Sequence, residues 1–97
     1  MRNLTLILTG MMFASSAVAA AGYSATLAQP IAQKTEFVAN GNLFRCEGSS
    51  CILTSHPVDA ESVQSCRALQ RRVGTLTSYI ADGKPFDAEK LAKCNSR

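Results

Sequence analysis

The stretch TEFVANGNLFRCEGSSCIL, residues 35–53, predicts two successive β-hairpins and decides the fold. Its first half alternates apolar and polar residues on both sides of Asn40-Gly41, a dipeptide typical of a two-residue type I′ turn. This turn fixes the register of the flanking strands and places Glu36 opposite Arg45, which is a favourable cross-strand charge pair. The turn and the charge pair therefore support the same register.

The second half of this stretch predicts the first disulfide. Glu47–Ser50 is a turn-rich loop of four residues, so a second hairpin here would place Cys46 directly opposite Cys51. The Cβ atoms of facing residues in a hairpin are close enough for a disulfide. The same face carries the apolar side chains of Phe37, Phe44 and Leu53. We therefore expect a Cys46–Cys51 bridge on the apolar face of the sheet.

The other two cysteines end two similar blocks of sequence. PVDAESVQSC ends at Cys66, and PFDAEKLAKC ends at Cys94. Each block is typical of a helix start, with Asp59 or Asp87 as the N-cap. The blocks share a hydrophobic staple, formed by Val58 with Val63 and by Phe86 with Leu91. Two such helices would each present one inward cysteine, which favours a Cys66–Cys94 bridge. A common helix-start pattern explains the similarity better than a duplication does.

The remaining segments complete a small α+β domain. Tyr23–Leu27 alternates weakly and predicts an edge strand. An apolar stripe predicts a helix over Ala60–Val73 that ends at Gly74. Thr75–Ala81 is rich in β-branched and aromatic residues and favours a strand, with a continuation of the helix as the alternative. We therefore expect a small antiparallel sheet of three to five strands with two short-to-medium helices, stapled by the two disulfides.

The N-terminus has the three-part order of a secretory signal peptide. Arg2 supplies a positive charge, Leu4–Phe13 is mostly apolar, and Ser15–Ala21 is almost entirely small. The apolar run is about half of the roughly 20 residues that a membrane span needs. We therefore expect a signal peptide over residues 1–20 with cleavage after residue 19, 20 or 21. No transmembrane anchor is expected after its removal.

The remaining chain, residues 21–97, is long enough for a single small domain. Four cysteines in a small exported chain indicate a disulfide framework and a periplasmic or secreted location. Removal of the signal peptide discards Arg2 and lowers the formal net charge by one, from +3 to +2. This charge is too small to indicate the clustered basic surface of a nucleic-acid-binding domain, so nucleic acid is not an expected partner.

The sequence contains no convincing catalytic set. Ser55, His56 and Asp59 suggest a hydrolase only superficially, because sequence neighbours rarely give nucleophile–base–orienter geometry and Asp59 is expected to act as an N-cap. The cysteine spacing matches neither the repeated close pairs of a structural zinc site nor a redox C-x-x-C motif. We therefore expect no enzyme activity, no cofactor and no metal.

Two groups of polar residues are candidates for binding a partner. Arg67, Arg71 and Arg72 lie close together on the first predicted helix and suggest a patch that recognises phosphate groups or an acidic partner. The alternative is a solvated helix face whose cations sit near the negative end of the helix dipole, and this alternative is favoured. The second group, Glu47, Ser49 and Ser50, lies at an exposed hairpin tip.

Several short motifs are similar to those of a known family. They are Tyr23-Ser24-Ala25-Thr26-Leu27, the Cys46-x₄-Cys51 pair, Cys66-Arg67-x-Leu69, and the closing Asp82-Gly83-Lys84…Leu91-Ala92-Lys93-Cys94-Asn95. Together they resemble a family of small, uncharacterised exported proteins of alphaproteobacteria. The resemblance covers nearly all of the chain after the signal peptide and implies a bacterial, periplasmic or secreted setting. It implies no activity, ligand or catalytic residue.

These observations favour an exported, non-enzymatic module that binds a protein or a component of the cell envelope. The alternative is an inhibitor of a secreted or periplasmic hydrolase that presents the loop Glu47–Ser50, because a preorganised loop loses little entropy on binding. A third class, a small periplasmic enzyme or metal carrier, would need His56 or free thiols.

Overall fold

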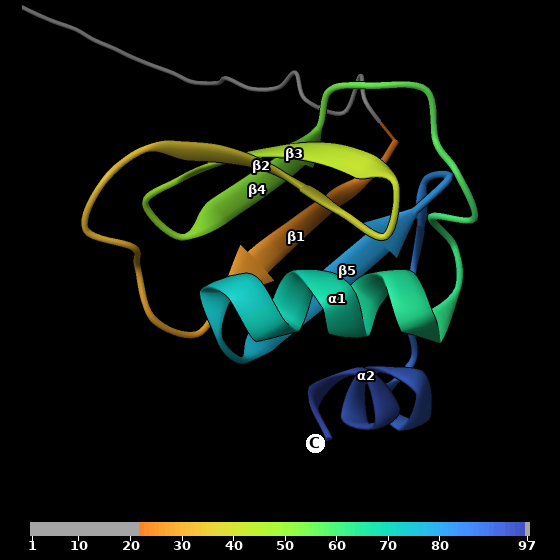
Figure 1. Cartoon of the computed structure of the whole chain (residues 1–97). Helices are drawn as coiled ribbons and strands as arrows, with labels where there is room; N and C mark the ends of the chain where they lie inside the picture. The colour runs from red at the N-terminus through yellow and green to blue at the C-terminus, as the bar shows by residue number, and fades with distance from the viewer. Residues whose placement is uncertain (1–21, 97) are drawn as a thin grey trace, which may run out of the picture.

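The computed structural model describes residues 22–96, which form a six-stranded antiparallel sheet with two helices (Figure 1). The strands are β1 (Ser24–Leu27), β2 (Thr35–Ala39), β3 (Asn42–Glu47), β4 (Ser50–Leu53), β5 (Leu76–Ala81) and β6 (Lys84–Pro85). The helices are α1 (Val63–Val73) and α2 (Ala88–Asn95). The predicted α+β class is confirmed. The predicted signal peptide lies outside the described residues.

The strand β6 raises the number of strands to six, above the expected three to five. Asp82 and Gly83 both have positive φ angles, of 54° and 76°, and form a tight turn. This turn folds Lys84 and Pro85 back onto the end of β5. A strand of two residues is too short to produce a periodic pattern, so the sequence did not predict it.

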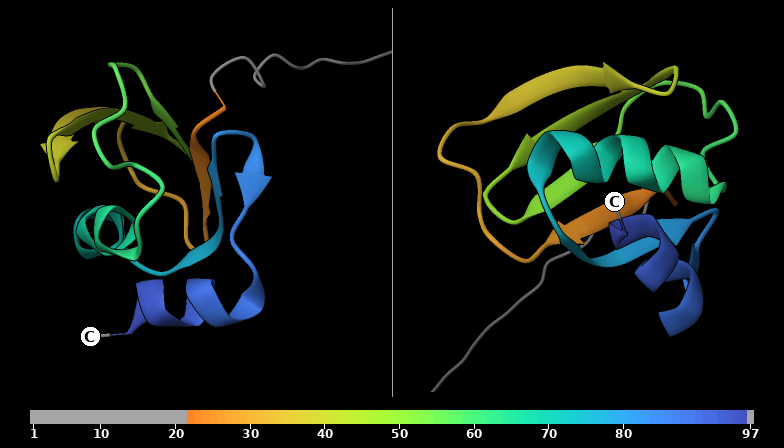
Figure 2. Two further views of the ribbon diagram at one scale, coloured as in Figure 1. Left: turned by 90° about the vertical axis from the view of Figure 1, so that its right-hand side faces the viewer. Right: turned by 60° about the horizontal axis from the view of Figure 1, so that its bottom comes forward.

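The strand order is β2-β3-β4-β1-β5-β6. The chain leaves β4, passes through α1 and returns as β5, while β1 fills the space between these two strands. Figure 2 shows the sheet curving around α1, with α2 packed against α1 and β5. The expectation that Tyr23–Leu27 is an edge strand is wrong, because β1 is paired on both sides. One of its inward residues, Ala25, is small and only weakly apolar. The alternation of apolar and polar residues is therefore weak, although the strand is central.

Both predicted hairpins are present. Asn40 and Gly41 have positive φ angles of 53° and 82°, as a type I′ turn requires. Glu36 faces Arg45 in the predicted register, and the carboxylate and guanidinium lie 3.5 Å apart. The positive φ angles and the salt bridge both agree with the register inferred from the sequence.

The second hairpin is tighter than expected. Cys46 faces Cys51, and the two form a disulfide. Glu47 also pairs with Ser50, so the turn consists of Gly48-Ser49 rather than four residues. The extra pair extends the ladder because Gly48 adopts a positive φ of 61°, which allows the chain to reverse within two residues.

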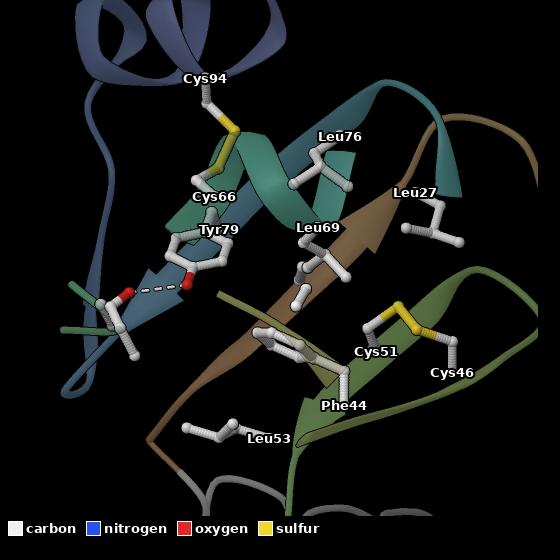
Figure 3. Close-up of a cluster of buried hydrophobic side chains, with 14 of the residues drawn as sticks. Leu27, Phe44, Cys46, Cys51, Leu53, Cys66, Leu69, Leu76, Tyr79 and Cys94 are labelled. Carbon is white, nitrogen blue, oxygen red and sulfur yellow. Dashed lines mark hydrogen bonds between the residues drawn. A yellow bond between two sulfur atoms is a disulfide. The ribbon is translucent and has the colours of Figure 1, made fainter. Parts of the chain in front are cut away.

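The core lies between α1 and the face of the sheet that carries the cysteines (Figure 3). Its largest fully buried apolar side chains are those of Phe44, Leu69, Leu76 and Tyr79. Strict alternation would place Leu76 and Tyr79 on opposite faces of β5. An irregularity in the pairing of β1 with β5 leaves Thr77 as an extra residue, and both side chains therefore face the core.

The Tyr79 hydroxyl ties β5 to the segment before α1. It donates a hydrogen bond of 2.7 Å to the carbonyl of Ala60, and both residues are buried (Figure 3). Burial is the main cause that raises the pKa of Tyr79 above its ordinary value, and the nearby Tyr23 and Glu61 raise it further. The phenol therefore stays protonated and keeps the proton that it donates.

The helix α1 starts later than predicted, at Val63 rather than Ala60. Its N-cap is Ser62, whose hydroxyl accepts a hydrogen bond from the Ser65 amide. Asp59 is not the N-cap, because it has a positive φ of 53° and lies in the turn before the helix. Val58 does not form the predicted staple with Val63: it is 53% exposed and lies beside Gly41. The Ala60 carbonyl accepts its hydrogen bond from Tyr79. A helix that started at Ala60 would use this carbonyl for a hydrogen bond within the helix instead.

The helix α2 starts as predicted. Asp87 is its N-cap and accepts a hydrogen bond of 2.8 Å from the Lys90 amide. Near its other end, Cys94 forms the predicted disulfide with Cys66 of α1. The next side chain, that of Asn95, pairs with the backbone of Leu76 by accepting from its N–H and donating to its carbonyl. The bridge and this amide together fix α2 against α1 and β5.

All four cysteines are in disulfides, which indicates an oxidising compartment. None of the helices within the described residues is long and apolar enough to span a membrane.

The long bridge should stabilise the protein more than the short one. Cys66 and Cys94 are 28 positions apart, whereas Cys46 and Cys51 are 5 apart. The chain-entropy model gives about 3.6 kcal/mol for closing the long loop and about 2.2 kcal/mol for the short one. We expect the double substitution of Cys66 and Cys94 by alanine to lower the urea midpoint more than that of Cys46 and Cys51.

Full reduction of both disulfides should abolish the cooperative unfolding transition of the protein. An unchanged melting curve in excess reductant would contradict this.

Candidate binding groove on α1

The helix α1 divides its residues between the core and the solvent. Cys66 and Leu69 point inward and are fully buried. Gln64, Arg67 and Arg71 have the spacing i, i+3 and i+7, which places them on one stripe of the helix away from those core residues. The fold therefore presents two arginines of α1 in one row on its outer side.

These residues line a hollow of about 480 Å³ between α1 and the β2–β3 turn. It is lined by Asn40, Gln64, Arg67, Ala68 and Arg71, and we call it the α1 groove. Asn40 comes from the turn and the other four come from the helix. The sequence predicts Asn40-Gly41 only as a turn, and nothing in its pattern indicates that this turn lies against α1.

A buried amide fixes the turn against the helix. The Asn40 side-chain amide donates to the hydroxyl of Ser65 at 2.9 Å, and that of Asn42 donates to the same hydroxyl at 3.2 Å. Asn42 also bonds the backbone of Val58 through both its amide nitrogen and its carbonyl oxygen. Asn42 and Ser65 are both fully buried. The groove therefore has a rigid wall on the side of the turn.

The positive charge of the groove is not compensated within it. No carboxylate is among its lining residues. The salt bridges found within residues 22–96 join Glu36 with Arg45 and Glu89 with Lys93, so neither Arg67 nor Arg71 belongs to one. The Nε atom of Arg67 is buried and has no hydrogen-bond partner in the described part of the chain. Such unpaired buried groups are few in native proteins and call for an explanation, such as an ion or water at that position.

The helix dipole explains only part of this arrangement. Arg71 lies in the last turn of α1, where a cation stabilises the negative end of the helix. Arg67 lies in the middle of the helix, where the dipole gives no such stabilisation. A solvated helix face therefore accounts for Arg71 but not for the buried, unpaired Nε of Arg67.

The third predicted arginine has a different environment. The guanidinium of Arg72 lies over the ring of Phe37, 4.3 Å from its centroid. This cation–π contact joins α1 to the edge strand β2. The structure thus separates Arg72 from Arg67 and Arg71, which the sequence had grouped together.

The second predicted group lies on another part of the molecule. Glu47 ends β3, Ser50 begins β4, and Ser49 lies in the turn between them. The carbonyl of Ser49 accepts from the Leu27 amide at 2.8 Å, and that of Gly48 accepts from the Ile31 amide at 3.0 Å. The turn is therefore held against the β1–β2 connection, and none of these residues lines the α1 groove.

The Ser55 hydroxyl and the backbone carbonyls of His56 and Asp59 take part in local hydrogen bonds. The Ser55 hydroxyl accepts from the Leu43 amide and donates to the carbonyl of His56. The Asp59 carbonyl accepts from both the amide and the hydroxyl of Ser62. Ser55 and His56 are exposed in the connection between β4 and α1.

Comparison with known proteins gives one match. The profile of a family of unknown function (DUF8200) matches residues 7–96. No curated protein and no solved structure matches the chain significantly.

The two environments of the arginines predict opposite effects on stability. We expect Arg67→Met to leave the free energy of unfolding unchanged or to raise it by about 1 kcal/mol, because it keeps the apolar stem and removes a buried N–H group that has no partner in the described part of the chain. We expect Arg72→Met to lower it by about 0.5–1 kcal/mol through loss of the contact with Phe37. Urea denaturation of both variants measures this difference. A larger loss for Arg67→Met than for Arg72→Met would show that Arg67 has a structural role.

Proposed function

Because the chain belongs to DUF8200, a family of unknown function, we propose its function from the geometry of the groove. We propose that it is an exported, non-enzymatic binding module of the periplasm or the extracellular medium of a bacterium. It binds a protein or an envelope component through an anionic group, a phosphate or carboxylate, held in the α1 groove.

The observation that carries this proposal is the unpaired cationic pair Arg67 and Arg71. Arginine offers a planar fork of N–H donors that matches the oxygens of phosphate and carboxylate. Both arginines line the groove, and no acidic residue lines it with them. An anion in the groove would offset the positive charge of the two arginines, which belong to no salt bridge found within residues 22–96.

The frame around the groove supports binding rather than catalysis. One disulfide fixes α1 through Cys66, immediately before Arg67, and hydrogen bonds from Asn40 and Asn42 to the Ser65 hydroxyl fix the turn at the opposite wall. A preorganised site loses less conformational entropy when a ligand binds. The two disulfides and the predicted signal peptide both favour an exported setting.

The proposal predicts a partner whose capture depends on two particular arginines. The oxidised protein is used as bait in an envelope extract, together with the double variant Arg67→Gln, Arg71→Gln. We expect one dominant partner on the unsubstituted protein, eluted by salt and by inorganic phosphate, because charge holds it. The double variant should lose this partner.

Arg72→Gln is the matched control, because it removes the same charge from the same helix but outside the groove. It should retain the partner. Equal retention by the double variant would place binding elsewhere and overturn the proposal. Turnover of envelope substrates by the purified protein would overturn its non-enzymatic part.

A second candidate function is inhibition of a secreted or periplasmic hydrolase by the β3–β4 turn. The observation in its favour is the way this turn is held. The Cys46–Cys51 bridge lies at its base, and two backbone hydrogen bonds tie Gly48 and Ser49 to the β1–β2 connection. Glu47 and Ser50 remain exposed beside it. A rigid, exposed turn is a suitable inhibitory element.

This second function predicts inhibition that depends on the turn. If it holds, the protein inhibits at least one member of a panel of secreted hydrolases. The double variant Glu47→Ala, Ser50→Ala should lose that inhibition, because it removes the exposed side chains of the turn. Glu36→Ala is the control, since it removes an exposed carboxylate from β2 instead. Undiminished inhibition by the double variant would exclude the turn as the inhibitory element.

A further inference from the structure

A second hollow, of about 260 Å³, lies beside the β5–β6 hairpin. It shares no lining residue with the α1 groove. Four charged side chains line it, and they come from four different segments. Glu61 precedes α1, Asp82 lies in the β5–β6 turn, Lys84 lies in β6, and Lys90 lies in the first half of α2.

These four charges do not neutralise one another directly. The salt bridges found within residues 22–96 involve none of them. Two acidic and two basic residues therefore line the same small space without a direct ion pair. A ligand with a single charge would be attracted by the acidic or the basic pair of residues and repelled by the other pair. A ligand with one positive and one negative charge could be attracted by both pairs.

The charges of both carboxylates influence one neighbouring side chain. Partial burial raises the pKa of Tyr23, and the charges of Asp82 and Glu61 raise it further. Both carboxylates therefore act on the same phenol, that of Tyr23. The turn that carries Asp82 is anchored there as well, because the Gly83 amide donates to the carbonyl of Gly22 at 2.9 Å.

An aromatic side chain of the hollow contacts one of the lysines. Phe86 lines the hollow, and the Nζ of Lys90 lies over its ring, 4.9 Å from the centroid. The other contact of the ring is with Tyr79, at a centroid distance of 4.8 Å, and the Phe86 amide donates to the Tyr79 carbonyl at 2.8 Å. Phe86 is thus fixed to the core and gives the hollow a firm apolar surface.

We propose that this hollow binds a small zwitterion, of the class of free amino acids and short peptides. The ligand's ammonium group lies between Glu61 and Asp82, its carboxylate meets Lys84 and Lys90, and its apolar part packs on Phe86. The volume suits a ligand of this size, since pockets for larger, drug-sized ligands occupy roughly 300–1,000 Å³. The site is independent of the α1 groove and of the function proposed for it.

The test uses L-alanyl-L-alanine as the probe, with the protein expressed from its full sequence in a host that forms disulfides. The dipeptide is titrated while the amide signals of Gly83 and Phe86 are followed by NMR. Its N-acetylated and C-amidated forms each lack one charge. We expect saturable shifts with the free dipeptide and binding weaker by about tenfold or more for each blocked form.

Substitutions separate this site from the rest of the surface. Glu61→Gln with Asp82→Asn, and Lys84→Gln with Lys90→Gln, should each weaken dipeptide binding by about tenfold or more. Arg71→Gln, in the α1 groove, should leave it unchanged. Equal binding of the blocked forms, unchanged binding in both double variants, or no saturable shift would overturn the proposal. Because the blocked dipeptides test the charges on the unsubstituted protein, the result does not depend on whether a variant folds.

Discussion

The buried side chain of Asn42 is the interaction on which the candidate site depends. Its amide nitrogen donates to the Asn40 carbonyl, the Val58 carbonyl and the Ser65 hydroxyl, and its oxygen accepts from the Val58 amide. It therefore joins the β2–β3 hairpin, the connection from β4 and the first turn of α1. A buried polar network stabilises a unique arrangement only when every member has a partner, and here each polar atom of the amide has one. The wall of the α1 groove is a consequence of this network.

The parts of the fold that the sequence predicted are those fixed by neighbouring residues. Asn40-Gly41 fixes a hairpin register within a few positions, and that register leads directly to the Cys46–Cys51 bridge. The elements that the sequence placed wrongly depend on distant partners. The start of α1 depends on Tyr79, whose hydroxyl takes the Ala60 carbonyl. The central position of β1 depends on pairing with both β4 and β5. Neither relation leaves a periodic signal in the local sequence.

The candidate site was predicted in part, for the same reason. The sequence identified the three arginines of α1 as a candidate patch. It placed all three in one group because they are close together in the chain. Helical spacing already distinguishes them, because residues four apart share a stripe and adjacent residues do not, so Arg71 lies with Arg67 while Arg72 does not. This signal could have been used. The contribution of Asn40, the contact of Arg72 with Phe37 and the unpaired Nε of Arg67 required the packing of the hairpin on α1.

The unpaired Nε of Arg67 links the stability of the protein to its proposed role. A buried donor without a partner costs about 1–3 kcal/mol, which is large for a domain whose core supplies only about 3–5 kcal/mol. The Cys66–Cys94 bridge, one residue earlier on α1, offsets this cost by constraining the unfolded chain. The same bridge holds the helix that carries both groove arginines. The charge arrangement of the groove is therefore tied to the oxidised protein, because the bridge that stabilises the domain also holds the helix that carries the arginines.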